Sequence, residues 1–305
     1  MNPVKIITVE KSRELEKAAD EGGLSFARMM ENAGRATARA VEQLLAPRDR
    51  RVVVLVGPGN NGGDGLVAAH YLAQVGARVT CYLWKREAAG DDNLERVQAG
   101  GLPVVWAEDD GDHEALRGLL QGADVVVDAL LGVGVSLPLR DNLRSLLETV
   151  NASLGERRGA AELAHAVPGA GLMAAPLVVA VDCPTGLDSD TGEVDPATLQ
   201  ADVTVTFAHP KVGLLRFPGA GKVGRIVVAE TRRQARAAAA LVAVDYEVLR
   251  PITDPVAAID DPEIAVFGTS GNVLSVSEYA RGDVDAALAA SPHVVHEVFH
   301  TQRIE

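Results

Sequence analysis

Short runs of aliphatic and β-branched residues recur along the chain, separated by longer segments whose apolar residues have helical spacing. Continuous apolar runs such as residues 51–56 (RVVVLV) are typical of strands buried on both faces of a parallel sheet. The predicted strands are residues 51–56, 79–84, 104–107, 124–130, 177–181 and 203–207. The predicted helices are residues 9–20, 24–46, 66–75, 112–120 and 141–150. Alternating strands and helices indicate βαβ units, so the sequence predicts an α/β fold, a Rossmann-like three-layer αβα sandwich with a mainly parallel sheet.

Residues 152–175 interrupt this alternation. They are rich in Ala, Gly, Glu and Arg and lie between a predicted helix and a predicted strand. Long connections of this kind run over the protein surface. We therefore expect an inserted surface loop here.

Composition and charge narrow the classes of function. The 305 residues are 47% hydrophobic, and no apolar run approaches the roughly 18–20 residues that span a bilayer. Residues 1–11 lack the apolar segment of a signal peptide, so a cytoplasmic protein is the simplest interpretation. The net charge of −13 argues against nucleic acid and membranes as partners, because both need basic clusters. A phosphate-bearing ligand is compatible with this charge, since helix N-termini bind phosphate through backbone amides.

The two cysteines, Cys81 and Cys183, are too few for a disulfide framework, and no Cys/His cluster has the spacing of zinc ligands. We expect both to be small buried hydrophobic residues in strands or at strand ends.

A glycine- and asparagine-rich segment at residues 57–65 (GPGNNGGDG) follows the first predicted strand. Loops in this position lie at the carboxyl edge of the sheet, where α/β proteins bind ligands. Glycines let the backbone take unusual dihedral angles and approach a ligand closely. The segment matches neither standard nucleotide fingerprint. A tight strand-to-helix turn would need only the glycines, and the added Asn60, Asn61 and Asp64 favour a binding site.

Two later strands also end in a carboxylate followed by a glycine-containing turn. Asp128 begins the segment DALLGVGVS, and Asp182 lies in AVDCPTGLD together with Thr185. Oxygen atoms delivered by three parallel strands to one edge suit a hard cation or a polar ligand. Asp128 could instead cap a turn, and Asp182 could be a turn cap or a ribose ligand.

The segment FAHPKVG after the last predicted strand carries His209 and Lys211. Lys211 could face a substrate phosphate or be an ordinary surface residue. We expect His209 to be a solvated loop residue.

These segments, in this order, resemble the NAD(P)H-hydrate epimerase family over residues 9–228. The segment MENAG at residues 30–34 adds a further match. The combination of MENAG, PGNNGGDG, DALLG and VDCPTGLD is far more specific than any one motif.

The resemblance implies the ligands and partners. The substrate would be NADHX or NADPHX, which are hydrated at C6 of the nicotinamide ring. A potassium ion would be held by Asn61, Asp128 and Thr185. Thr185 stands where many relatives have Ser. Family members commonly form homodimers, and a separate ATP- or ADP-dependent dehydratase converts the S epimer to NAD(P)H. The residues implied in substrate binding are Asn60, Asn61, Gly62, Gly63, Asp64, Gly132, Val133, Gly134, Val135, Ser136, Leu137, Pro138 and Asp182.

The reaction gives Asp182 a role. C6 of the hydrate is bonded to a ring nitrogen and to a hydroxyl group, so expulsion of water leaves an iminium that water can attack from either face. A positioned acid/base speeds both halves of this reaction. We hypothesise that Asp182 is that catalytic group.

The epimerase pattern is expected to occupy residues 1–230. Residues 231–305 form a short C-terminal appendage that resembles an internal stretch of the molybdenum-binding subunit of xanthine dehydrogenases and aldehyde oxidases, in GNVLSVSEYARGDVDAALAAS and FHTQRIE. That family's pterin and molybdenum sites would lie beyond a TQRIE-like sequence, so we expect no molybdenum chemistry. A fused fragment without function is the simpler interpretation, and an appendage that mediates association is the other.

Two other classes of function were weighed. A non-catalytic binding or scaffold module of the same fold would be free to lose Asn61, Asp128, Asp182 and Thr185, all of which are present. An ordinary NAD(P)-dependent oxidoreductase would be expected to carry the GxGxxG fingerprint and an acidic residue for the ribose, and both are missing. The sequence therefore favours an epimerase.

Overall fold

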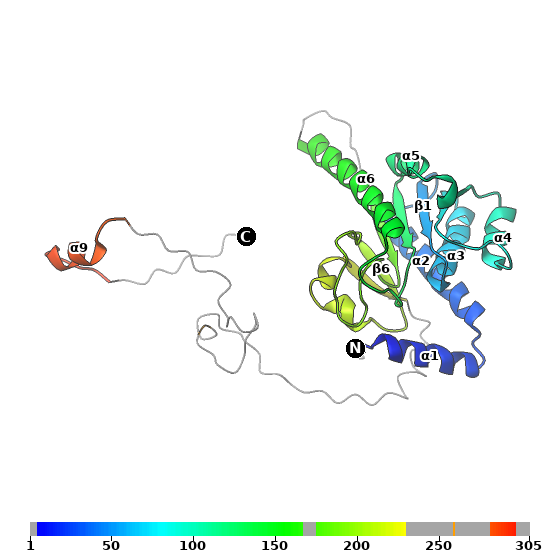
Figure 1. Cartoon of the computed structure of the whole chain (residues 1–305), viewed down its shortest axis with the longest axis horizontal. Helices are drawn as coiled ribbons and strands as arrows, with labels where there is room; N and C mark the ends of the chain where they lie inside the picture. The colour runs from blue at the N-terminus through cyan, green and yellow to red at the C-terminus, as the bar shows by residue number, and fades with distance from the viewer. Residues whose placement is uncertain (1–4, 167–174, 230–258, 260–280, 297–305) are drawn as a thin grey trace. The chain divides into compact units, whose positions relative to one another are not determined.

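The computed structural model describes residues 5–166, 175–229, 259 and 281–296, and the chain divides into two units, Met1–Val242 and Ala243–Glu305. The first unit contains the α/β fold (Figure 1). In the second unit, the described residues contain the helix α9 (Val284–Ala290), which Asp283 caps by accepting a hydrogen bond from the amide of Ala286 at 3.0 Å. Most of the predicted appendage lies outside the described residues.

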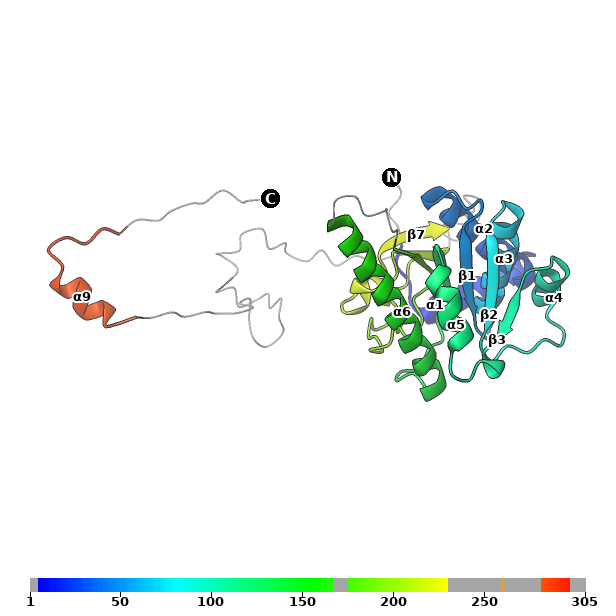
Figure 2. The same ribbon diagram turned by 90° about the horizontal axis from the view of Figure 1, so that it is seen from above.

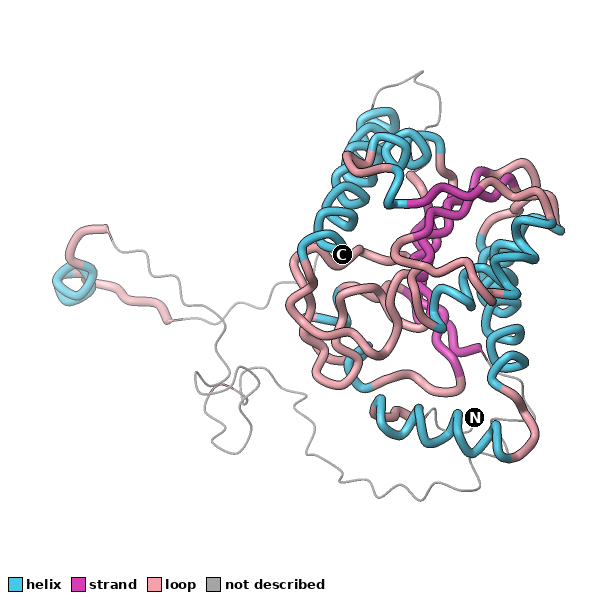
Figure 3. Tube along the Cα trace, turned by 45° about the vertical axis from the view of Figure 1, so that its right-hand side comes forward, coloured by secondary structure: helices cyan, strands magenta, loops and turns pink. Residues whose placement is uncertain are grey.

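A seven-stranded parallel sheet forms the centre of the first unit, with strand order β3-β2-β1-β4-β5-β6-β7. This arrangement confirms the predicted α/β fold class, and Figures 2 and 3 show helices on either side of the strands. The strands are β1 (Arg51–Val56), β2 (Arg78–Leu83), β3 (Val104–Trp106), β4 (Val125–Ala129), β5 (Leu177–Val181), β6 (Val203–Phe207) and β7 (Arg225–Ala229).

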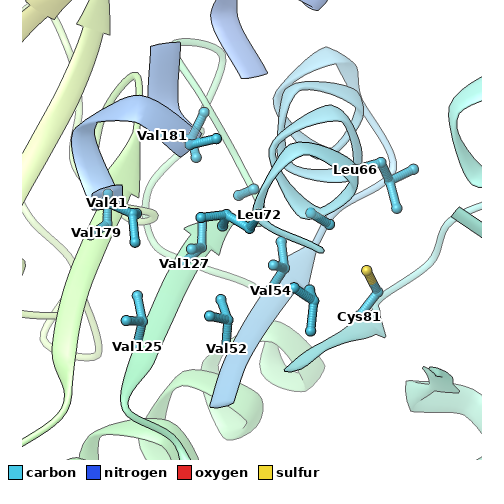
Figure 4. Close-up of a cluster of buried hydrophobic side chains, with 14 of the residues drawn as sticks. Val41, Val52, Val54, Leu66, Leu72, Cys81, Val125, Val127, Val179 and Val181 are labelled. Atoms are coloured by element: carbon cyan, nitrogen blue, oxygen red, sulfur yellow. The ribbon is translucent and has the colours of Figure 1, made fainter. Parts of the chain in front are cut away.

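Helices cover both faces of this sheet because alternate residues of each strand point to opposite sides. The helices are α1 (Val9–Glu21), α2 (Phe26–Leu44), α3 (Asn60–Gln74), α4 (Asp92–Ala99), α5 (Glu114–Gly122) and α6 (Asp141–Ala166). Val52, Val54 and Val56 of β1 pack in one buried cluster with α2, α3 and α4, part of which is drawn in Figure 4. Val53 and Leu55 pack in a second cluster with α5 and α6.

The surface loop predicted for residues 152–175 is wrong in its first half, because α6 continues to Ala166. Leu154 is 3% exposed and extends the buried stripe of Val150 by one turn. Nδ2 of Asn151 donates a hydrogen bond to the carbonyl oxygen of Ala197 at 2.8 Å. An alanine-rich stretch favours helix when such contacts are made. Residues 167–174 lie outside the described part of the chain.

One unpredicted helix and one helix cap also differ from the sequence prediction. The helix α4 was not predicted, although Asp91 caps it by accepting hydrogen bonds from the amides of Asn93 and Leu94, each at 3.1 Å. The predicted cap of α5, Asp112, accepts one hydrogen bond from that helix. The main capping acceptor there is Asp110, whose carboxylate accepts hydrogen bonds from two amides of the first turn.

Both cysteines are buried, Cys81 in β2 and Cys183 directly after β5. Burial raises the pKa of each thiol to about 12, so both are uncharged at neutral pH. None of the helices in the described ranges is long and apolar enough to cross a membrane.

Candidate active site

The candidate site lies at the carboxyl edge of the sheet, where the chain leaves β1, β4, β5 and β6. The strand order reverses beside β1, because the chain runs outward through β2 and β3 and then returns to β4 on the other side. Open α/β proteins bind ligands at such a switch point. A cavity of about 1390 Å³ lies here, which exceeds the roughly 300–1,000 Å³ of most small-molecule sites. The sequence-predicted residues that line it are Asn60, Asn61, Asp64, Gly132, Val133, Gly134 and Asp182.

The glycine-rich segment 57–65 is not a loop throughout, because α3 already begins at Asn60. Its glycines do not take positive φ angles, so the expectation of unusual dihedral angles is wrong. They permit close packing instead. A Cβ atom on Gly57 would lie 1.6 Å from the carbonyl oxygen of Leu130, and one on Gly62 would lie 2.0 Å from the carbonyl oxygen of Gly57. The absence of side chains thus brings the start of α3 against the ends of β1 and β4.

Asn61, in the first turn of α3, has a buried amide group without a hydrogen-bond partner. The residue is 8% exposed, and neither Oδ1 nor Nδ2 makes a hydrogen bond within the described part of the chain. A Cβ atom on Gly132 would lie 3.3 Å from Oδ1 of Asn61, so the loop after β4 closes over this amide. Buried polar atoms nearly always have a partner in protein, water or an ion. Asn61 therefore marks a position that a ligand completes.

Asp128 and Thr185 form a second buried polar group, at the ends of β4 and β5. The Asp128 carboxylate is fully buried and accepts hydrogen bonds from the amide of Thr185 at 2.8 Å and from its hydroxyl at 2.6 Å. The amide of Leu130 adds a third hydrogen bond at 3.3 Å. Burial raises the pKa of Asp128, and these hydrogen bonds oppose the rise. The pair thus joins the loops after β4 and β5.

Asp182 directly follows β5 and has a φ angle of 64°, which non-glycine residues seldom adopt. Its amide donates a hydrogen bond to the carbonyl oxygen of Val205 at 2.7 Å, continuing the pairing with β6. The amide of Cys183 turns back to the carbonyl oxygen of Val181 at 2.8 Å. Such a conformation costs about 1–3 kcal/mol and is concentrated at functional sites. The sharp turn leaves the Asp182 side chain at the edge of the cavity.

One oxygen of the Asp182 carboxylate, Oδ1, is held by three donors. It accepts hydrogen bonds from Oγ1 of Thr206 at 3.0 Å and the amide of Phe207 at 3.4 Å, and it forms an ion pair with Nζ of Lys211. Lys211 is 1% exposed, so the interpretation as a surface residue is wrong. Its ammonium group also donates to Oγ1 of Thr206 at 3.1 Å. His209, expected to be solvated, is only 7% exposed.

Among the other carboxyl groups that line this cavity, Asp64 and Glu16 interact electrostatically with Asp182. Asp64 is 9% exposed, and burial raises its pKa well above the usual value, with the negative charges of Asp182 and Glu16 raising it further. Glu16 of α1 was not singled out by the sequence analysis. The pKa of Glu16 is also raised, and burial is the largest cause. Three carboxyl groups therefore interact electrostatically around one cavity.

The remaining sequence-predicted residues do not line the cavity. Gly62 and Gly63 are buried in the first turns of α3. Val135 and Leu137 pack against the second buried cluster, and the side chains of Ser136 and Pro138 are exposed.

Arg86 and Arg13 are among the arginines that line the cavity, and the sequence analysis did not single them out. Arg86 follows β2, and its Nη1 donates a hydrogen bond to the carbonyl oxygen of Gly57 at 2.8 Å, which supports the segment after β1. Arg13 of α1 is exposed, and its Nη2 lies 3.6 Å from the Cβ position of Gly134. Both come from segments without a motif, so only the tertiary structure identifies them.

The MENAG motif joins α2 to α3. A Cβ atom on Gly34 would lie 2.4 Å from Cβ of Val67, so the helices approach more closely than a larger residue would allow. The Glu31 carboxylate accepts hydrogen bonds from the hydroxyl of Tyr71 at 2.5 Å and from Arg96 at 2.8 Å. This motif positions α3, and with it Asn61 and Asp64.

The fold and the site together define a class of protein: a Rossmann-like α/β protein with a ligand cavity at the strand switch point and neither standard nucleotide fingerprint. Within this class, the chain belongs to the family described as YjeF-related protein N-terminus, whose model matches residues 26–213.

Individual relatives agree with this assignment. An NAD(P)H-hydrate epimerase of Rhodopirellula baltica is 34% identical over 228 residues, covering 73% of this chain and 82% of the relative. A bifunctional NAD(P)H-hydrate repair enzyme of Thermofilum pendens is 37% identical over 230 residues, covering 74% of this chain. The chain spans only 40% of that relative's length. The crystal structure of the yeast protein ynu0 has the same fold, with a TM-score of 0.58 and 23% identity over 74% of this chain and 87% of the yeast chain.

Proposed function

We propose that this protein epimerises the R and S forms of NADHX and NADPHX, the hydrated forms of the nicotinamide cofactors. The observation that carries the proposal is the Asp182 carboxylate, held on one oxygen by Thr206, Phe207 and Lys211 at the edge of a large cavity. Positioning of this kind suits a group that transfers protons. The epimerase of Rhodopirellula baltica and the bifunctional repair enzymes bear names that agree with this activity.

The cavity suits a dinucleotide in size and polarity. Its volume of about 1390 Å³ accommodates a ligand larger than a single nucleotide. The N-terminus of α3, beginning at Asn60, offers backbone amides to a phosphate. Arg13 adds a guanidinium group at the rim, beside Gly134. We infer that these groups bind the pyrophosphate and that the nicotinamide ring lies against Asp182.

We propose a potassium ion at Asn61, Asp128 and Thr185. The residues fit a hard monovalent cation: Oδ1 of Asn61 is buried without a partner, and the fully buried Asp128 carries a carboxylate that burial destabilises. Bound there, the ion would offset that negative charge and join the loops after β1, β4 and β5. All three residues supply oxygen atoms, the ligands that such ions prefer.

Asp182 then acts on the C6 hydroxyl group or on the water that replaces it. Oδ1 is occupied by its three donors, which leaves Oδ2 as the oxygen for proton transfer. The turn around Asp182 fixes the direction of this oxygen. Lys211 is a positioning residue, because it touches Asp182 and acts through it.

The test is the rate of epimerisation by the variant Asp182→Asn. A general acid/base supplies about 10²- to 10⁴-fold, so we expect kcat to fall by at least 100-fold while the variant stays folded. A loss of less than about tenfold would show that Asp182 is not the catalytic group. Asp109→Asn is a matched control, since Asp109 is exposed and does not line the cavity.

We further propose that the protein acts in the cytoplasm as a homodimer and that a separate dehydratase consumes its S epimer. The bifunctional relatives support the link to a second repair activity. Light scattering on the purified chain tests the dimer. Complete conversion of R-NADHX to NADH only when both enzymes are present tests the coupling. The resemblance of residues 231–305 to a molybdenum-enzyme fragment stays a separate proposal.

A further inference from the structure

We propose that Asp64 is a second catalytic residue, which protonates the departing C6 hydroxyl group while Asp182 accepts a proton from the incoming water. This inference rests on the proposed epimerase function and divides the acid and base roles between two carboxyl groups of the same cavity.

The first argument is the isolation of the Asp64 carboxyl group. Five aspartates in the described part of the chain are buried, and Asp64 is 9% exposed. The other four each accept three or more hydrogen bonds, for example Asp110 from Ala115, Leu116 and Tyr82. No described residue donates a hydrogen bond to Asp64. Asp64 lines the cavity, so its carboxyl group is open to a ligand and not committed to donors from the described residues. The other three buried aspartates are Asp128, Asp182 and Asp195.

The second argument is the position of the two carboxyl groups. Asp64 lies in α3, which follows β1, and Asp182 follows β5. The strand β4 separates β1 from β5 in the sheet, so the two side chains enter the cavity from different elements. Epimerisation needs water to leave from one face of the ring and to add to the other. Two groups on separate elements can serve the two faces of the ring.

The third argument is the difference in charge environment. Burial raises the pKa of Asp64. The negative charges of Asp182 and Glu16 raise this pKa further, and the cations Lys211 and Arg86, which act more weakly, lower it. Asp64 therefore tends to keep its proton. Asp182, by contrast, lies against the ammonium group of Lys211, with which it forms an ion pair. Carboxyl groups in such contrasting environments are how enzymes separate an acid from a base.

The proton transfers balance over one turnover. Asp64 gives its proton to the C6 hydroxyl group, the C6–O bond breaks, and its electron pair leaves with water while the ring nitrogen shares its lone pair with C6. A second water molecule then bonds to C6 from the opposite face and gives one proton to Asp182. The product is the other epimer, with Asp64 charged and Asp182 protonated. The same two groups in exchanged roles catalyse the reverse direction, and exchange with solvent resets them.

The experiment compares Asp64→Asn, Asp64→Glu and the control Asp109→Asn in the full chain, with steady-state kinetics from pH 5 to 10. We expect Asp64→Asn to lower kcat by about 10²- to 10⁴-fold with little change in KM, since Asn keeps a polar group of the same size. We expect Asp64→Glu to recover part of the loss. The alkaline decline of kcat/KM in the unmodified enzyme should be absent from the residual activity of Asp64→Asn.

An infrared difference spectrum provides a readout that does not depend on turnover. The unmodified protein should show a protonated-carboxyl band at neutral pH that Asp64→Asn lacks. An active protein whose Asp64→Asn variant keeps kcat within threefold, or raises KM alone, would overturn the donor role and leave the epimerase function standing. A folded unmodified protein without activity would overturn both.

Discussion

Replacing Lys211 by methionine tests whether the buried ion pair with Asp182 organises the site. The two side chains have similar length, so the substitution removes the charge and leaves most of the packing. Lys211 is 1% exposed and Asp182 is 9% exposed, so the loss would leave a buried carboxylate without its counter-charge. Breaking a buried pair in this way costs about 3–5 kcal/mol.

The structure places the expected loss at the lower end of this range. Oδ1 of Asp182 would keep the hydroxyl of Thr206 and the amide of Phe207 as donors. Asp182 also lines the cavity, where water can approach it. We therefore expect Lys211→Met to lower the free energy of unfolding by about 3 kcal/mol.

The assay is urea unfolding followed by tryptophan fluorescence. Both tryptophans, Trp84 and Trp106, lie in the first unit and report on it. The double variant Lys211→Met/Asp182→Asn should be more stable than the sum of the single losses predicts, by about 1–3 kcal/mol, because it leaves no unpaired charge. Lys17→Met is the control, since Lys17 is 77% exposed and should change stability by less than about 0.5 kcal/mol. A loss below about 1 kcal/mol for Lys211→Met, or strict additivity, would refute the reasoning.

Three other variants test the site. Gly57→Ala should lower the free energy of unfolding by more than about 3 kcal/mol, because its Cβ atom would lie 1.6 Å from the carbonyl oxygen of Leu130. Gly59→Ala is the control: its Cβ atom would have no neighbour within 4 Å, so the same urea titration should show almost no change. Thr185→Ala should abolish the rise in Tm that KCl produces over NaCl, and Thr185→Ser should keep this rise. If Thr185→Ala keeps the rise as well, Thr185 does not hold the potassium ion. The pKa of Asp64 is raised from 3.8, so the folded state holds a proton that the unfolded state loses, and stability falls as pH rises above about 4. Asp64→Asn should remove this decline in urea titrations between pH 4 and 8, and parallel curves for both proteins would contradict it.

Six of the seven strands were predicted from sequence, most of them because they are buried on both faces, whereas the partly exposed β7 was not predicted. The run at residues 51–56 is apolar throughout and matches β1 residue for residue. The end of α6 was not predictable from local pattern, because its continuation depends on contacts such as Asn151 with Ala197. The start of α3 was hidden as well. A glycine-rich segment predicts a loop, and only the tertiary structure shows that Gly62 is there to pack against the carbonyl oxygen of Gly57.

The site shows the same division between local and tertiary information. Asp128 and Asp182 were found because each directly follows an apolar strand. Lys211 could not be assigned from its own segment, since its role depends on β6 lying beside β5. In that pairing Val181 lies opposite Val205, so the next residues, Asp182 and Thr206, lie side by side. Lys211 follows a few residues after Thr206 and reaches the same carboxylate. Sequence identified Asp128, Asp182 and Thr185 but neither Glu16 nor the role of Lys211.

The measurement that tests the central claim most directly is the equilibration of purified R-NADHX and R-NADPHX by the full chain, followed by chromatography that separates the R and S forms. We expect the protein to accelerate equilibration, with potassium increasing the rate and Asp182→Ala abolishing it. A folded protein that leaves the rate at its uncatalysed value, with or without potassium, would contradict the account.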